Sequence, residues 1–349
     1  MIGLTHHLAR RSVEQASTLQ HPQIEPWKAS ILFVTTALAL VTISLIGYIY
    51  EQVVATLVMV ENPKEQMTGP TKIVVSDEKT GEVEIEVEGQ VVKPELLSLR
   101  FFKTLGQLRA RAGPRAAYRG FGVWLLFHFI DGLVQRFINS VVPNYFDLTP
   151  HFAAAVSTIL ITRLMLAWTL VVIAEPTFKF WRCDALRLSS AKKVIVPTLI
   201  LALTNQIQVL IMRDLSVTLS RPLNDPEDLK KIAPSLATNV LAAIIVFVAF
   251  HTPARIMLTR IQASLLPDEV EAIVPFDRSF GGKVAPAITG GSGVLSIKDA
   301  LRSIDGRVFR RVMTVYAKTI ALQLFAATIF IGIYVAELYL MIGGLDFGN

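Results

Sequence analysis

The chain has little cysteine and little charge for its length. A single cysteine among 349 residues, Cys183, excludes an internal disulfide and a cluster of thiolates around a metal. Charged residues make up 18% of the chain, whereas soluble proteins carry about 25%. The histidines have no partners at the spacing of metal ligands, and Gly281–Gly282–Lys283 lacks the rest of a phosphate-binding loop. We therefore expect no metal, no cofactor and no enzymatic activity.

What the chain does have is long apolar runs. Five of them hold at most one charge each and cover residues 29–58, 153–174, 195–212, 235–250 and 319–336. A weaker run at 120–142 contains Asp131 and Arg136. Runs of about 18 apolar residues or more are typical of membrane-spanning helices. The sequence thus predicts an all-α membrane protein with six transmembrane helices. The alternative is a soluble all-α protein that buries six apolar helices.

Basic residues are placed unevenly between these runs. The connections at 61–119, 177–193 and 255–311 carry 24 Lys/Arg, against seven in the other connections and termini. With six spans these two sets fall on opposite sides of the membrane. The positive-inside tendency therefore predicts both termini on one side and the three basic connections on the other. Anionic lipid accounts for such flanking charge, so we expect no nucleic-acid binding.

Recurring landmarks suggest an internal repeat. Glu51 and Arg255 lie 204 residues apart, and Gly113 and Gly306, each before a basic stretch and a span, lie 193 apart. After a polar segment at 1–27, the sequence therefore predicts three two-helix units in a single membrane domain, at 28–142, 151–234 and 235–343. Residues 72–92 alternate apolar and acidic residues around a Thr80–Gly81 turn, which predicts a β-hairpin inserted in the first unit. Residues 97–112 have the apolar spacing of an amphipathic helix.

The stretch HTPARIMLTRIQ at 251–262 resembles a motif of the mitochondrial carrier family, in which each odd-numbered helix ends in Pro-x-Asp/Glu-x-x-Lys/Arg-x-Arg/Lys-x-Gln. Pro253, Arg260 and Gln262 match its proline and its closing residues. Pro176 matches the proline of a second copy, and Glu51 the acidic residue of a first. GPRAAYRGF at 113–121 is similar to the run that precedes the family's even-numbered helices. The resemblance implies a six-helix bundle of three repeats, like that of the carriers.

The motif departs from the family at its charges. The acidic position holds Phe178 in the second copy and Arg255 in the third, and the basic positions hold Val54, Trp181 and Leu258. In the family, the acidic and basic residues form ion pairs that close the cavity on the matrix side. A full ring of such pairs cannot form here. We therefore interpret Pro176 and Pro253 as helix kinks, with Arg260 and Gln262 on a helix of the basic connection.

Charges inside a membrane usually face a cavity or the interior of the bundle. Counting from Gly120, where carriers place substrate contacts on the second helix, gives Phe127 and Asp131. Lys318 lies at similar depth on the sixth span, and Asn205 near the middle of the fourth. These four residues are the predicted solute-binding site. The alternative is that the charged ones pair with each other or reach to the membrane surface.

The resemblance implies a solute transporter of a mitochondrial membrane, with the inner membrane favoured and the outer membrane possible. Its partners would be the lipid bilayer and an unidentified small solute. A second hypothesis follows from the lost ion pairs: a carrier-like scaffold, insertion factor or adaptor of the outer membrane that does not transport and binds other proteins.

Overall fold

The computed structural model describes residues 26–61, 97, 99–143, 149–175, 188–220, 226–267, 270–277, 280, 282, 284 and 293–346. Almost all of these residues are helical, and the extended pairing among them is limited to one bridge between Ala174 and Ala272. The expected hairpin at 72–92 and the expected kink at Pro176 lie outside the described residues.

Six helical runs are long and apolar enough to cross a membrane: Pro26–Val60, Ala116–Val141, Thr149–Ile173, Ser190–Leu219, Lys230–Ala263 and Gly306–Met341. Each contains one of the six apolar runs of the sequence, so the prediction of six candidate spans in a helical protein is confirmed. Most runs are longer than the apolar stretch that predicted them, because helices continue past the hydrocarbon region into polar sequence.

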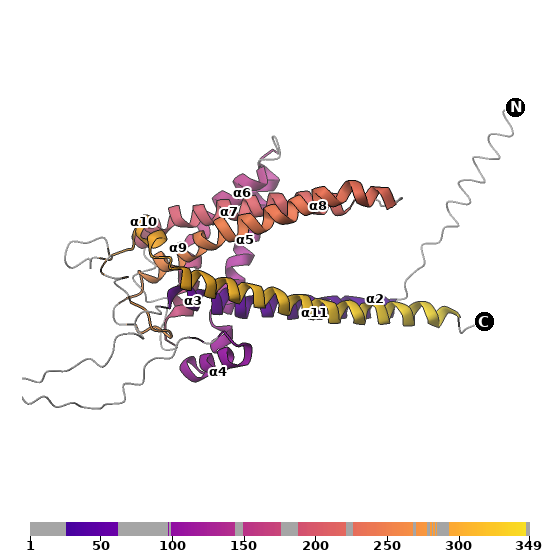
Figure 1. Cartoon of the computed structure of the whole chain (residues 1–349), viewed down its shortest axis with the longest axis horizontal. Coiled ribbons are helices and arrows are strands. Elements are labelled where there is room, and N and C mark those ends of the chain that lie inside the picture. Colours follow the sequence, from indigo (N-terminus) through magenta and orange to yellow (C-terminus); the bar gives the residue numbers. More distant parts are fainter. Residues whose placement is uncertain are drawn as a thin grey trace, which may run out of the picture. The chain divides into compact units, whose positions relative to one another are not determined.

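The helices follow one another along the chain in this order (Figure 1). The first run is α2 (Pro26–Gly47), the π-helical η1 (Tyr48–Val54) and α3 (Ala55–Val60). Then come α4 (Phe101–Ala112), the short η3 (Ala116–Tyr118), α5 (Phe121–Val141), α6 (Thr149–Ile173) and α7 (Leu188–Leu219). The last are α8 (Pro226–Val246), the π-helical η6 (Phe247–His251), α9 (Thr252–Ala263), α10 (Ile297–Arg302) and α11 (Gly306–Asp346).

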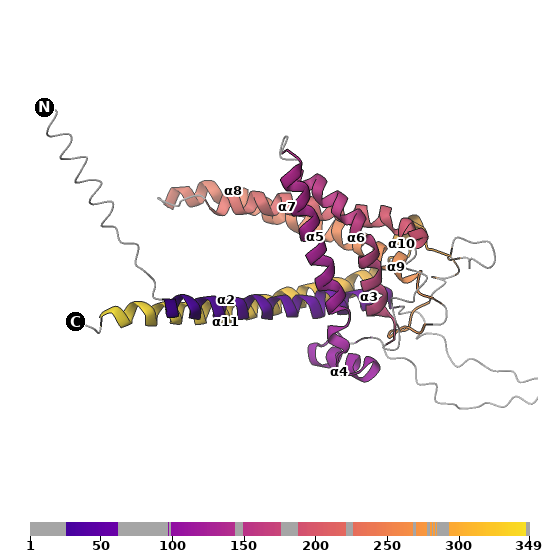
Figure 2. The ribbon, with the colours of Figure 1, turned by 180° about the vertical axis from the view of Figure 1, so that it is seen from behind.

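The chain forms two compact units, and the boundary between them runs through two helices. In the described chain the first unit consists of α2 and of α11 from Ile320 onward, which lie side by side in both views (Figures 1 and 2). Polar side chains join them: Thr35 Oγ1 donates to Glu337 Oε1 at 2.6 Å, and the hydroxyls of Thr36 and Tyr334 are in contact. Such bonds help to hold two helices together in a lipid environment, where apolar packing alone gives little driving force.

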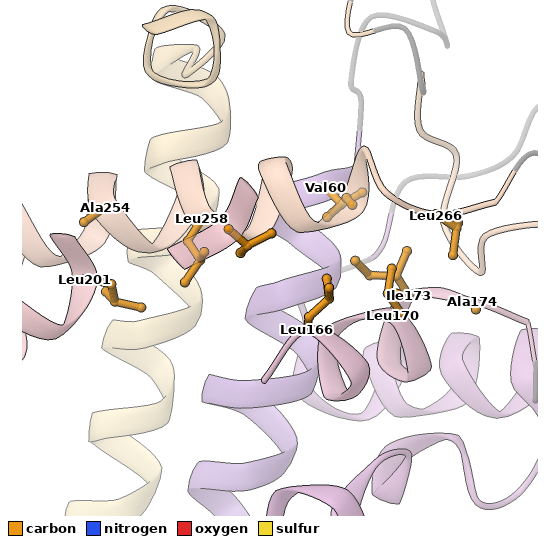
Figure 3. Close-up of a cluster of buried hydrophobic side chains, with 11 residues drawn as sticks. Val60, Leu166, Leu170, Ile173, Ala174, Leu201, Ala254, Leu258 and Leu266 are labelled. Atoms are coloured by element: carbon orange, nitrogen blue, oxygen red, sulfur yellow. The ribbon is translucent and has the colours of Figure 1, made fainter. Parts of the chain in front are cut away.

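The second unit, from Tyr48 to Thr319, has its core where α6 meets α3, α7 and α9. Leu166, Leu170 and Ile173 project from α6 at helical spacing towards Leu258 of α9 and Val60 of α3 (Figure 3). All five side chains are buried. Packing against α6 therefore brings the carboxyl-terminal parts of the first and fifth helical runs together, and the polar network described below lies there.

The short α4 is amphipathic, as the sequence predicted. It buries Thr104, Leu108 and Ala112, which follow one another at four-residue intervals, and it exposes Phe102. It ends at Gly113, whose φ of 83° suits glycine because it has no Cβ. Gly120 also has positive φ, at 71°, and a Cβ there would lie 2.9 Å from Trp168 Cδ1. Both its conformation and its contact with Trp168 therefore require glycine where α5 begins.

Candidate functional site: a polar network at the π-helical segments

Two candidate spans change to π-helix near their carboxyl-terminal ends, at η1 and at η6. In η6 the backbone N–H of Thr252 donates to the carbonyl of Phe247, five residues earlier, and its hydroxyl bonds the same oxygen at 2.9 Å. Pro253 follows at once and has no N–H to continue the α-helical pattern. Short π segments of this kind occur frequently at functional sites, because they turn side chains away from the regular helix face.

The two π segments bring Glu51 and Arg255 together. Arg255 Nη1 lies 3.7 Å from Glu51 Oε1, while its Nη2 donates to Gln52 Oε1 at 2.6 Å and to the Glu51 carbonyl at 3.2 Å. The side chains are 13% exposed for Arg255 and 39% for Glu51. Arg255 therefore joins η1 to α9 through an ion pair that is long and partly accessible.

Arg260 and Gln262 lie deeper than the sequence indicated. We expected them on a helix of the basic connection, but both are buried in the last turn of α9. Arg260 donates to the Met59 carbonyl at 3.0 Å and to the carbonyl and hydroxyl of Ser303 at 2.6 and 2.7 Å. Gln262 accepts from Thr169 Oγ1 at 2.7 Å. These two motif residues thus tie α9 to α3, α6 and the end of α10.

Glu61 and Arg311 hold both polar atoms of one peptide unit. Leu97 N–H donates to Glu61 Oε1 at 2.6 Å, Arg311 Nη2 donates to Glu61 Oε2 at 2.6 Å, and Arg311 also donates to the Leu97 carbonyl at 2.8 Å. Burial raises the pKa of the Glu61 carboxyl, and the charge of Arg311 and the Leu97 N–H oppose this shift only in part. The group is therefore a buried acid whose ionised form depends on Arg311.

Arg119 and Tyr48 form a further joint beside the start of α5. The Arg119 guanidinium donates to the carbonyls of Val171 at 2.9 Å and Glu175 at 3.0 Å, at the end of α6. Its own carbonyl accepts from the Tyr48 hydroxyl, which in turn accepts from Trp168 Nε1 at 3.3 Å. Backbone oxygens at a helix end have no intrahelical donor, so Arg119 satisfies groups that would otherwise be unpaired.

Tyr316 and His251 complete the surroundings of Arg255. Their rings both contact Phe247, that of His251 stacked at 5.2 Å and that of Tyr316 edge-on at 5.2 Å. Tyr316 is 3% exposed, and its buried hydroxyl has no hydrogen-bond partner. Thr252 and Met313 are also in contact, at 3.8 Å between Oγ1 and Sδ. Residues of α9 and α11 therefore enclose an unused hydroxyl close to the Glu51–Arg255 pair.

The four residues predicted to bind solute are spread over three helices. Phe127 and Asp131 lie one turn apart on α5, where Asp131 Oδ1 accepts from the Ser157 hydroxyl and, at 3.0 Å, from Gln135. Asn205 is exposed on α7. Lys318 donates to the Leu99 carbonyl at 2.8 Å. Asp131 and Lys318 are described with different partners and form no ion pair with each other.

The network at η1 and η6 is the feature that sequence reasoning missed. One signal was available, since Glu51 and Arg255 were already paired as repeat landmarks with opposite charges. No local pattern marks the partners of Arg260, Arg311 and Arg119, because most of them are backbone carbonyls. Among the described residues, no group of three His, Cys, Asp or Glu side chains is placed to hold a metal ion.

Neither a family model nor a curated protein matches this chain. The resemblance to mitochondrial carriers therefore depends on the motif residues themselves, chiefly Pro253, Arg260 and Gln262.

Proposed function

We propose that this chain is a solute transporter of a mitochondrial membrane, built like the mitochondrial carriers from three two-helix repeats around a central path. The observation that carries the proposal is the Glu51–Arg255 contact between two helices that are both π-helical nearby. It joins the first and fifth helical runs at the position where carriers place the charges that close their cavity. Here the pairing is reversed, because the acidic partner is on the first motif copy and a basic one replaces the acid of the third.

Transport by alternating access needs some contacts that break easily and others that persist. A partly exposed ion pair such as Glu51–Arg255 contributes about 0–1 kcal/mol, which thermal motion can supply. The buried bonds from Arg260 and Arg311 are charge-assisted and worth roughly 1.5–3 kcal/mol each. We therefore assign the opening step to Glu51–Arg255 and a permanent bracing role to Arg260 and Arg311. In this proposal Phe127, Asp131, Asn205 and Lys318 line the path of the solute within the bilayer.

Charge exchange tests the proposal. The chain is reconstituted in proteoliposomes, and uptake is measured for a panel of radiolabelled metabolites. We expect Glu51→Arg and Arg255→Glu each to reduce uptake by at least tenfold, and the double exchange to restore most of it. Lys231→Gln is the matched control, because it breaks the exposed Lys231–Asp228 pair on α8.

The control should transport like the wild type. If the double exchange stays as inactive as the single ones while all variants remain folded, the pair is not the closing contact. If the folded wild type takes up no solute of the panel above the level of empty liposomes, the transport proposal fails.

One observation favours a second candidate, the carrier-like scaffold or adaptor of the outer membrane. Arg119, Arg260 and Arg311 all donate to backbone carbonyls, which fixes the ends of five helices and leaves only Glu51–Arg255 as a separable charged contact. A rigid bundle suits a platform better than a transport cycle. Absence of uptake together with an outer-membrane position, shown by protease accessibility in intact mitochondria, would favour this candidate.

A further inference from the structure

The Tyr316 hydroxyl is an unusual group for a helix interior. It is buried, it lies on α11 beside Phe247, and it has no hydrogen-bond partner. Leaving such a group unpaired costs about 1–3 kcal/mol, and native proteins rarely do so without a reason. The charges of both Arg255 and Glu51 act on this hydroxyl, which places it beside that pair. Its position therefore calls for an acceptor atom that the described chain does not supply.

Arg255 is also incompletely matched. Its hydrogen bonds go to two neutral oxygens, the Gln52 amide oxygen and the Glu51 carbonyl, and the Glu51 carboxylate oxygen is 3.7 Å from Nη1. A guanidinium that pairs fully with a carboxylate makes bonds of about 2.7–2.9 Å, often two in parallel. The positive charge of Arg255 is thus available to a better-placed anion.

His251 adds a third polar group on the same side. It precedes Arg255 by one helical turn and stacks on the same Phe247 ring that Tyr316 contacts. Its ring nitrogens have no hydrogen-bond partner in the described part of the chain. Arg255, Tyr316 and His251 thus present a guanidinium fork, a hydroxyl and an imidazole, with Glu51 as the nearest acid.

We propose that Arg255, Tyr316 and His251 bind a small oxyanion, a carboxylate or phosphate group, which takes the place of the Glu51 carboxylate. The planar fork of arginine matches both groups, and the Tyr316 hydroxyl gains its acceptor. Glu51 is partly exposed and is free to turn away when the anion arrives. Binding then breaks the link between η1 and α9. This inference rests on the same contact as the proposed function and names the chemical class of the solute.

Anion binding is measured on the purified full-length protein in detergent. Thermal unfolding and isothermal titration are recorded with sodium phosphate and with sodium succinate at constant ionic strength, and chloride and glucose serve as controls. We expect either oxyanion to raise the unfolding temperature, while the controls leave it unchanged. The two salts tell a phosphate site from a carboxylate site.

Four variants locate the site. Glu51→Gln removes the internal competitor and should tighten binding about tenfold. Tyr316→Phe should weaken binding roughly threefold to tenfold, as expected for the loss of one hydrogen bond. Arg255→Gln should abolish binding. Tyr339→Phe, on the same helix but 76% exposed, is the matched control and should bind like the wild type.

Binding that persists in Arg255→Gln would overturn the inference, and so would a Glu51→Gln protein that binds neither salt. If Arg255→Gln does not fold, as judged by circular dichroism and gel filtration, the opposite effects of Glu51→Gln and Tyr316→Phe decide. Binding without uptake in proteoliposomes would leave this inference standing and remove the transport proposal. Uptake without binding at this position would do the reverse.

Discussion

Asp131 is half-buried on a candidate span and has a local partner on each side, Ser157 of α6 and Gln135 one turn later on α5. Its partners differ from those of Lys318, which bonds the backbone of the segment before α4. A carboxylate at membrane depth stays ionised at a tolerable cost only when such donors surround it. The solute path we propose would therefore meet Asp131 as part of a small hydroxyl and amide cluster.

A double-mutant cycle tests these partners. We expect Asp131→Asn and Ser157→Ala to be coupled by about 0.5–3 kcal/mol, because their side chains are in contact, while Asp131→Asn and Lys318→Gln should be additive within about 0.5 kcal/mol. Stability is measured by denaturant unfolding in mixed micelles. Strong coupling of Asp131 with Lys318 would mean that the two residues share a solute or pair in another state of the protein.

Glu61 gives a pH-dependent prediction. Because burial raises its pKa in the folded protein, its contribution is fully present below the pKa of the unfolded chain, about 4.3. It is lost as the pH rises through the raised value. We expect the unfolding temperature of the wild type to fall relative to Glu61→Gln over that rise, measured by scanning fluorimetry at a series of pH values. A constant difference between the two proteins would show that Arg311 compensates the carboxylate in full.

Arg311 is the other half of that pair, and its loss should be more damaging than that of the acid. Arg311→Gln leaves the Glu61 carboxyl buried without its counter-ion, a change that typically costs about 3–5 kcal/mol. Arg310→Gln, the exposed neighbour on α11, is the control and should have little effect. Equal stability of the two variants in denaturant unfolding would contradict the pairing of Arg311 with Glu61.

At the scale of elements, the spans were predictable and their partners were not. A long apolar run such as 319–336 identifies a span because length and composition are local properties of the chain. The contact between Arg260 and the Met59 carbonyl joins residues 201 positions apart, and every residue offers a carbonyl, so no sequence pattern selects this one. The π segments were missed for a related reason, since no residue type in Tyr48–Val54 distinguishes a π turn from an α turn. The predicted site residues on three spans remain a prediction.

Pro253 shows how one residue acts on a whole helix. It follows η6 and lacks the N–H that would bond the carbonyl of Ala249 in an α-helix. We expect Pro253→Ala to allow a regular α-helix across this point. The variant should insert into the membrane normally but move α9 relative to α8. Spin labels at Val240 and Ser264, in a Cys183→Ser background, would report the altered distance.

For that experiment, Pro234→Ala near the start of α8 is the control for loss of a proline as such. Failure of Pro253→Ala to insert would mean that the proline is required for integration rather than for helix shape.

For the whole molecule, six spans and an uneven distribution of basic residues fix the expected topology. Both termini should lie on the side opposite the three basic connections. Single cysteines placed at Ser76 and Gly348, both outside the described residues, should react with a membrane-impermeant maleimide from opposite sides of sealed vesicles. Labelling from the same side would remove one span from the bundle or add one.

The peptide clamp of Glu61, Arg311 and Leu97 has a consequence for how this chain tolerates change in length. Residues 62–96 leave the folded protein at Glu61 and rejoin it at Leu97, and those two residues are hydrogen-bonded to each other. Since the folded bundle already holds the two ends together, the segment between them can grow or shrink at small cost, about 0.6 kcal/mol for each doubling of its length. This is the point of the chain at which an added domain, or a fluorescent reporter inserted by the experimenter, would disturb the membrane bundle least.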